Sequence, residues 1–159
     1  MLVSNLIAPI VFAATVFADG AAINDGLKAV DADIKALTAS LTGFSGDLFA
    51  AIPVLGATLS LKSVIDKTTK TANASQPLTS DDTTSLAATV ETIITDATAS
   101  IDAFIAAKPK FDKLLIVTPI AVGQVKGLQT STAALGNAIV AKVPADYKDV
   151  ATSLRYRRL

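Results

Sequence analysis

The sequence predicts an all-α protein, a single-domain bundle of five mainly antiparallel helices that could enclose a central apolar cavity. Apolar residues recur at helical spacing almost to the end of the chain, and no segment alternates with period two over a useful length. Glycine, proline and polar residues interrupt the pattern at intervals that suit helix ends. A chain of 159 residues can bury one continuous core, so we expect one folded domain over residues 19–159.

The first predicted helix has a single apolar stripe, which steps along the chain by threes and fours and therefore lies on one face. The stripe consists of Ile23, Leu27, Val30, Ile34, Leu37 and Leu41. Gly43 and Gly46 break the pattern, and Asp47 is placed to cap a second helix with apolar positions over residues 48–65. Pro53 requires this helix either to kink or to begin at that residue.

A polar connection over residues 73–77 precedes the third helix, and residues 79–82 supply cap candidates and negative charge for its first turn. Its apolar positions run from Leu86 to Ile105. Pro109 is expected to end this helix and to begin the fourth, because proline fits a first turn but cannot donate within a helix interior.

The fourth helix is expected to extend to Val143 and to bend at Pro119, Gly123 and Gly127. Pro144 then restarts the chain into a short final helix over residues 147–154. The bends could splay neighbouring helices and leave apolar space between them.

Residues 1–18 are expected to form a secretory signal peptide, because residues 2–18 are apolar and nearly uncharged and end in small or branched side chains. The run is interrupted by Ser4, Asn5 and Pro9 and is shorter than the roughly 20 residues of a membrane span. An apolar first helix of the domain is the alternative. We therefore expect an extracellular or cell-wall protein, without a transmembrane segment once mature, and a glycan on Asn73 of the sequon Asn-Ala-Ser.

Catalytic chemistry has few candidates, since histidine and cysteine are both absent. A serine with a lysine as base is conceivable, as in Ser60 with Lys62 or Ser63 with Lys67, but nothing in the sequence places such a pair in a cleft. Asp81 and Asp82 could bind a cation, but an aspartate-rich helix N-terminus needs no cation to explain it, so we expect them to cap the helix. Fourteen basic residues balance fourteen acidic ones, which argues against nucleic acid. We predict a non-enzymatic protein without metal or cofactor.

Aliphatic residues are abundant whereas aromatic residues make up only 5% of the chain, so an apolar cavity between the helices would suit a long acyl chain. For any single residue of these stripes, ordinary core is the more common role. A fatty-acid carboxylate could be held by serine or threonine hydroxyls or by a lysine near the mouth. The predicted cavity-lining residues are Leu55, Leu59, Leu86, Val90, Ile94, Ile101, Phe104, Phe111, Leu115, Val122 and Val125.

The order and spacing of several segments resemble those of a known family. These segments are Leu27-Asp31-Ile34-Leu37, Ala51-Ile52-Pro53-Val54-Leu55, Pro77 to Asp81, Ile101-Asp102-Ala103, Lys108 to Phe111, Leu128 to Leu135 and the Pro144 start of the last helix. Over residues 23–150 the chain resembles the fungal hydrophobic surface-binding protein A family, also known as cell-wall galactomannoproteins or antigenic mannoproteins.

The resemblance implies a secreted five-helix bundle, here expected to be monomeric, that binds fatty acids or related lipids in a central apolar tunnel. The alternatives that it implies are an adhesin that coats hydrophobic surfaces and recruits a secreted hydrolase, and a structural wall mannoprotein. Because the chain has neither a Ser/Thr-rich stalk nor an apolar tail, a freely secreted form is expected. The short basic ending, residues 155–159, could leave one wall of the tunnel open.

Overall fold

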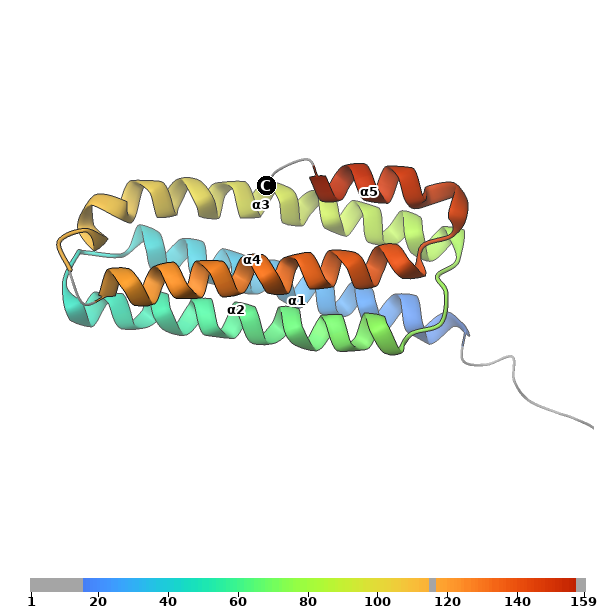
Figure 1. Cartoon of the computed structure of the whole chain (residues 1–159), viewed down its shortest axis with the longest axis horizontal. Coiled ribbons are helices and arrows are strands. Elements are labelled where there is room, and N and C mark those ends of the chain that lie inside the picture. The colour runs from blue at the N-terminus through green and yellow to red at the C-terminus, as the bar shows by residue number, and fades with distance from the viewer. Residues whose placement is uncertain (1–15, 115–116, 157–159) are drawn as a thin grey trace, which may run out of the picture.

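The computed structural model describes residues 16–114 and 117–156, and in these residues it confirms the predicted all-α bundle (Figure 1). No strand occurs in them. The elements are α1 (Val16–Thr42), α2 (Leu48–Ala74), α3 (Ser80–Phe111), α4 (Val117–Lys142), a 3-10 turn η1 (Ala145–Tyr147) and α5 (Lys148–Tyr156). Four long helices therefore form the bundle, and the short α5 packs against the end of α4.

The helix starts at α2 and α3 confirm the predicted caps. The Asp47 carboxylate accepts a hydrogen bond from the Ala50 backbone N–H at 2.9 Å. At α3, Thr79 and Asp82 form a reciprocal capping box, because each side chain accepts a hydrogen bond from the other's backbone N–H. Capping therefore explains Asp82 without a cation.

The prolines act differently from the prediction at two positions. α3 continues through Pro109 and ends at Phe111, because Ala107 and Phe111 are both buried and their packing extends the helix past the proline. α4 begins at Val117, and Pro119 lies in its first turn, where the missing N–H would have had no partner within the helix. Pro53 lies inside α2, which begins five residues earlier at Leu48.

Consecutive long helices run antiparallel, but the neighbouring pairs α1/α3 and α2/α4 run parallel. α1 packs along both α2 and α3, and α2 packs along α4. The predicted apolar stripe of α1 is buried along its whole length, from Ile23 to Leu41. At Gly26 the helices approach so closely that a Cβ would lie 2.7 Å from Thr68 Cγ2 of α2. α1 is therefore the central packing element of the bundle.

The structure does not test the predicted signal peptide or the predicted glycan on Asn73. The predicted signal peptide lies outside the described residues except for residues 16–18, which are the first turn of α1. Asn73 is exposed in the last turn of α2 rather than in the connection, and Ser75 of the same sequon is buried as the C-cap. Cleavage of residues 1–18 and glycosylation of Asn73 stay predictions.

Candidate functional site

Helices α3 and α4 lie opposite each other without packing backbone to backbone, unlike the other neighbours in the bundle. Polar contacts join α1 to α3, where the Thr89 hydroxyl donates to Asn24 Oδ1 at 2.6 Å and Lys35 pairs with Asp96 at 3.3 Å. In the described residues, the one side-chain bond between α3 and α4 is at their connecting turn, from the Thr118 hydroxyl to the Phe111 carbonyl. Along the rest of their length, the described residues of the two helices share no side-chain hydrogen bond or ion pair.

The contacts of α3 with α1 and of α4 with α2 determine how each helix is rotated, and therefore which apolar sides of α3 and α4 face each other. Thr89 and Asp96 place one side of α3 against α1, and Gly127, where a Cβ would lie 3.6 Å from Lys62 Cε, places one side of α4 against α2. The adjacent sides carry half-buried apolar residues at helical spacing. What we term the α3–α4 seam consists of Val90, Ile93, Ile94, Ala97 and Phe104 of α3 with Val125, Leu128 and Ile139 of α4.

The seam differs from the rest of the core in how much water reaches it. The stripe of α1 is at most 8% exposed at any position, whereas every seam residue is only half-buried. Toward the turn that joins α3 to α4 the same sides continue into exposed residues, with Ile101 at 55% and Val122 at 49% exposure. The seam is thus an incompletely covered apolar surface along one side of the bundle.

Most of the predicted lining residues lie on this side of the molecule. Val90, Ile94, Phe104 and Val125 are in the seam, and Ile101 and Val122 are at its exposed edge. Leu86 and Phe111 belong to the closed core instead, at 3% and 4% exposure.

The predicted lining residues of α2 do not join the seam. Leu55 is half-buried, and Leu59 requires a correction because it is 57% exposed and lines an outer depression. Helical spacing fixes which residues share a face, but the rotation of α2 against its neighbours decides which face points inward. Leu115 lies outside the described residues.

The seam also contains residues that the prediction did not assign to the cavity. These are Ile93, Ala97, Leu128 and Ile139, which the sequence identified as apolar helix positions only. Gln124 of α4 was not singled out at all, although its side-chain Oε1 is buried and has no hydrogen-bond partner in the described residues. A lone glutamine in a helix gives no sequence signal, since most such residues are exposed.

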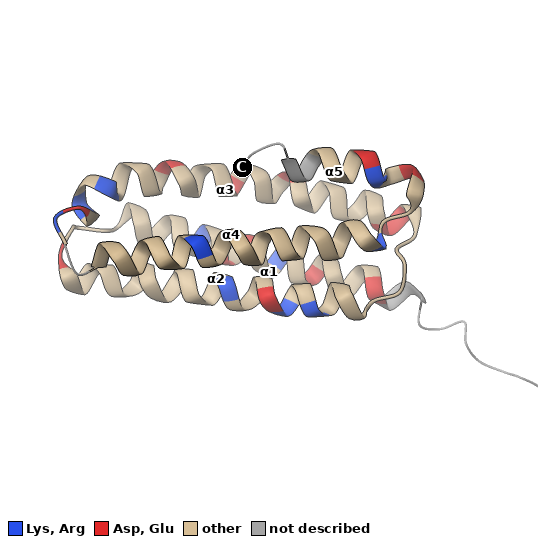
Figure 2. Cartoon of the chain, viewed as in Figure 1, with Lys and Arg blue, Asp and Glu red and all other residues tan. Residues whose placement is uncertain are grey.

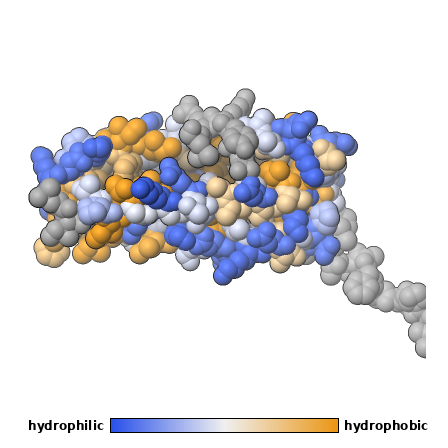
Figure 3. All heavy atoms as spheres, viewed as in Figure 1, coloured by the Kyte–Doolittle hydropathy of each residue, from blue (hydrophilic) through white to orange (hydrophobic). Residues whose placement is uncertain are grey.

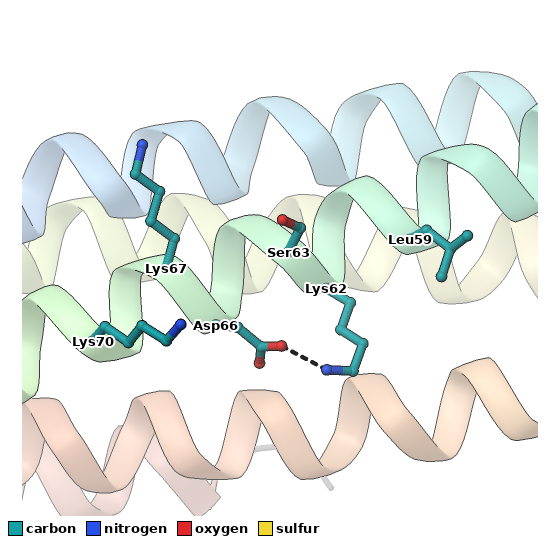
Figure 4. A pocket seen from close by; sticks show the side chains of 6 residues that line it. All are labelled: Leu59, Lys62, Ser63, Asp66, Lys67 and Lys70. Atoms are coloured by element: carbon teal, nitrogen blue, oxygen red, sulfur yellow. Dashed lines mark hydrogen bonds and ion pairs between the residues drawn. The ribbon is translucent and has the colours of Figure 1, made fainter.

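A surface depression lies on the outer side of α2, away from the seam (Figure 4). It is lined by Leu59, Lys62, Ser63, Asp66, Lys67 and Lys70, and Lys62 donates to Asp66 at 2.6 Å. Three lysines and one aspartate make it basic, but it is open to solvent and its one close ion pair joins residues one helical turn apart. Ser63 and Lys67, a serine–lysine pair that the sequence offered, both line this open depression, and no hydrogen bond joins their side chains in the described residues.

The perturbed ionisable groups of the described residues are ordinary surface pairs and caps. Hydrogen bonds from Lys62 and then Ser131 hold the pKa of Asp66 below its usual value of 3.8. Hydrogen bonds to Asp31 and Asp96 raise the pKa of Lys35, and bonds from Ser45 and the Ala50 N–H lower the pKa of Asp47. Each shift favours the charged form at neutral pH, which stabilises structure and does not prepare a proton for transfer.

Large exposed hydrophobic residues gather at one end of the bundle, where α2 and α4 begin and α3 ends (Figures 1 and 3). What we term the apolar end consists of Leu48, Phe49, Ile52, Ile101, Ile105, Ile120 and Val122. Few charges lie nearby on α4 or on the first half of α2 (Figure 2). By length and composition alone α2 could cross a membrane, but here it packs between α1 and α4. The apolar end continues directly into the seam through Ile101 and Val122.

The chain is similar to several known proteins. Residues 20–141 match the family described as hydrophobic surface binding protein A. The structure of AfMP4p, an Aspergillus mannoprotein solved in complex with palmitic acid, is 30% identical over 86% of this chain and 90% of that one, with a TM-score of 0.82.

Two domains of the Penicillium marneffei MP1 protein have the same fold. Ligand-binding domain 1, complexed with arachidonic acids, has a TM-score of 0.81 at 12% identity and covers 87% of this chain and 89% of that one. Ligand-binding domain 2, complexed with multiple arachidonic acids, has a TM-score of 0.78 at 14% identity and covers 86% of each chain. No curated protein matches the chain in sequence.

Proposed function

Because the chain belongs to the hydrophobic surface-binding protein A family, we propose that it binds long-chain fatty acids or related lipids along the α3–α4 seam. The observation that carries the proposal is the contrast in packing: α1 is closed against two helices, whereas the apolar sides of α3 and α4 remain half exposed. An alkyl chain laid between these two helices would cover that surface. The complex of AfMP4p with palmitic acid supports the ligand class.

The free energy available from the seam is sufficient for useful affinity. Each buried methylene contributes about 0.8 kcal/mol, so a dozen methylenes contribute roughly 10 kcal/mol before costs. Ordering the flexible chain and losing its free motion remove several kcal/mol of this. A dissociation constant of micromolar order or lower follows, since 1 μM corresponds to about 8 kcal/mol.

The protein acts as a non-catalytic carrier, a role supported by its membership of a surface-binding family and by its 30% identical relative, which was solved with a fatty acid. It is secreted or held in the cell wall as a monomer, with a glycan on the exposed Asn73. The mannoprotein nature of a 30% identical relative supports that location.

Native mass spectrometry of the secreted protein tests lipid binding directly. We expect a bound fatty acid at near-stoichiometric amount, identified after denaturing extraction, and a rise of several degrees in the melting temperature of delipidated protein on adding palmitic acid. An empty protein whose melting temperature ignores palmitic acid would contradict the proposal.

A second candidate function is adsorption to hydrophobic surfaces through the apolar end. Seven large hydrophobic side chains on three helices lie exposed there, and Phe49 is 81% exposed. Contiguous exposed apolar patches on soluble proteins commonly mark interaction sites. A protein adsorbed in this way could also recruit a secreted hydrolase to the surface.

Removing two of these side chains should reduce adsorption without unfolding the protein. We expect the double variant Phe49→Ser/Ile52→Ser to lose at least half of its adsorption to polystyrene beads, because both side chains are exposed. Val150→Ser is the matched control, since Val150 is 57% exposed outside the apolar end. Equal adsorption of the two variants would argue against this second function. Circular dichroism checks that both remain helical.

A further inference from the structure

Gln124 of α4 has a buried polar atom that forms no hydrogen bond in the described residues. It lies seven residues after Val117 and seven before Ser131, and because both of these are buried, this spacing directs Gln124 inward as well. Its Oε1 is buried and accepts no hydrogen bond from any described residue. A buried acceptor without a donor destabilises a protein and calls for an explanation.

The helix beside Gln124 supplies no donor. Gly127 lies next to Lys62 and Ser131 bonds to Asp66, so α2 and α4 run in register with an offset of 65 residues. Gln124 therefore lies level with Leu59, which has no side-chain donor. The buried hydroxyl of the adjacent Thr58 already donates to the Val54 carbonyl at 2.8 Å. Lys62, one turn further along, is bound to Asp66.

The surroundings on α3 are apolar. Phe111 ends α3 and Val117 begins α4, and both are buried on either side of the connecting turn. Phe104 lies seven residues before Phe111, and Gln124 lies seven residues after Val117. Seven helical residues rise about 10 Å, so Phe104 and Gln124 lie at the same level in the bundle. Phe104 stacks on Phe111 with ring centroids 5.8 Å apart. From Phe104 to Val90 the seam extends for about 21 Å along α3, enough for a long alkyl chain.

We infer that Gln124 anchors the head group of the bound lipid and selects one that carries an O–H donor, namely a neutral carboxylic acid. The inference rests on the proposed lipid-binding function. The acid O–H donates to Gln124 Oε1, and the Gln124 Nε2–H donates to the acid carbonyl, so a carboxamide and a carboxyl group satisfy each other with two hydrogen bonds. Apolar surroundings favour the neutral form of the acid.

The Gln124 Oε1 could also accept a hydrogen bond from the hydroxyl of a fatty alcohol. Unlike a carboxylic acid, the alcohol has no second oxygen to accept a hydrogen bond from the Nε2–H at the same time. An ester offers no donor and would leave Oε1 unpaired. Palmitic acid, 1-hexadecanol and methyl palmitate therefore separate the head-group chemistries on one alkyl chain.

The test measures the dissociation constants of these three lipids by displacement of a fluorescent fatty acid from the delipidated full chain. Wild type should bind palmitic acid about tenfold more tightly than methyl palmitate, with 1-hexadecanol between them. The near-isosteric variant Gln124→Met should lose that preference by weakening acid binding about tenfold while leaving ester binding unchanged. Gln129→Met, at an exposed position of the same helix, should behave like wild type.

Two results would overturn the assignment in different ways. A preference for the acid that persists in Gln124→Met would overturn the role of Gln124 alone. Failure of wild type to bind any of the three lipids would overturn the proposed function and this assignment together. Gln124→Leu repeats the test with a second side-chain shape, and neither variant should melt below wild type without lipid, because each removes an unpaired buried acceptor.

Discussion

Replacing Phe44 with alanine is expected to lower the free energy of unfolding by about 3–5 kcal/mol. Phe44 lies in the connection between α1 and α2, yet it is only 1% exposed. Its ring stacks on Phe111 at the end of α3 with centroids 4.2 Å apart, and Phe111 stacks in turn on Phe104. Truncation would leave a cavity where three segments meet, and the surrounding helices cannot collapse freely into it.

Urea denaturation followed by circular dichroism measures this loss, and Phe49→Ala is its matched control. Phe49 is a phenylalanine five residues away that is 81% exposed, so its truncation should change the stability by no more than about 0.5 kcal/mol. Comparable losses in the two variants would show that the Phe44 ring is not a structural anchor of this end of the bundle.

Replacing Ala97 with tryptophan is expected to weaken palmitic acid binding on the order of a hundredfold, because the indole would occupy the seam in place of the alkyl chain. Ala97 is half-buried on the α3 side of the seam, between Ile93 and Ile101 on the same side of the helix. Because Ala97 is half-buried and not closed into the core, the larger side chain can extend partly toward solvent. The fold should therefore tolerate the change, with a cost within the usual 1–3 kcal/mol of an overpacked site.

Calorimetric titration of delipidated protein with palmitic acid measures this effect, with Ala88→Trp as the control. Ala88 is an exposed alanine of the same helix, and a tryptophan there should leave the affinity unchanged. If Ala97→Trp bound palmitic acid as tightly as wild type while remaining folded, the ligand would have to lie elsewhere in the bundle.

The helices and their caps were predictable because their signals are local. The stripe from Ile23 to Leu41 steps along one helix face, and burial of the whole stripe followed from that spacing. Asp47 and Thr79 cap α2 and α3 through bonds to residues only three positions away. The absence of histidine and cysteine likewise limited the available chemistry from composition alone.

The boundaries near prolines were less predictable, since local preference competes there with tertiary packing. Pro109 has the local character of a helix terminator, but burial of Phe111 continues α3 for two residues beyond it. Phe44 likewise follows the glycine break at Gly43, and nothing local indicates that its ring fills the junction of α1, α2 and α3.

By itself the sequence determined an all-α bundle, the residues on each helix face and the apolar character of the helix sides on which the proposed lipid site depends. The tertiary structure alone decided which faces meet: α1 took the central position, the α3–α4 seam stayed half exposed, and Leu59 turned outward while Gln124 turned inward. The physical reason is that helical periodicity fixes the directions of side chains relative to their own helix axis. The rotation and spacing of neighbouring helices arise from side chains far apart in the chain, and no single helix contains that information.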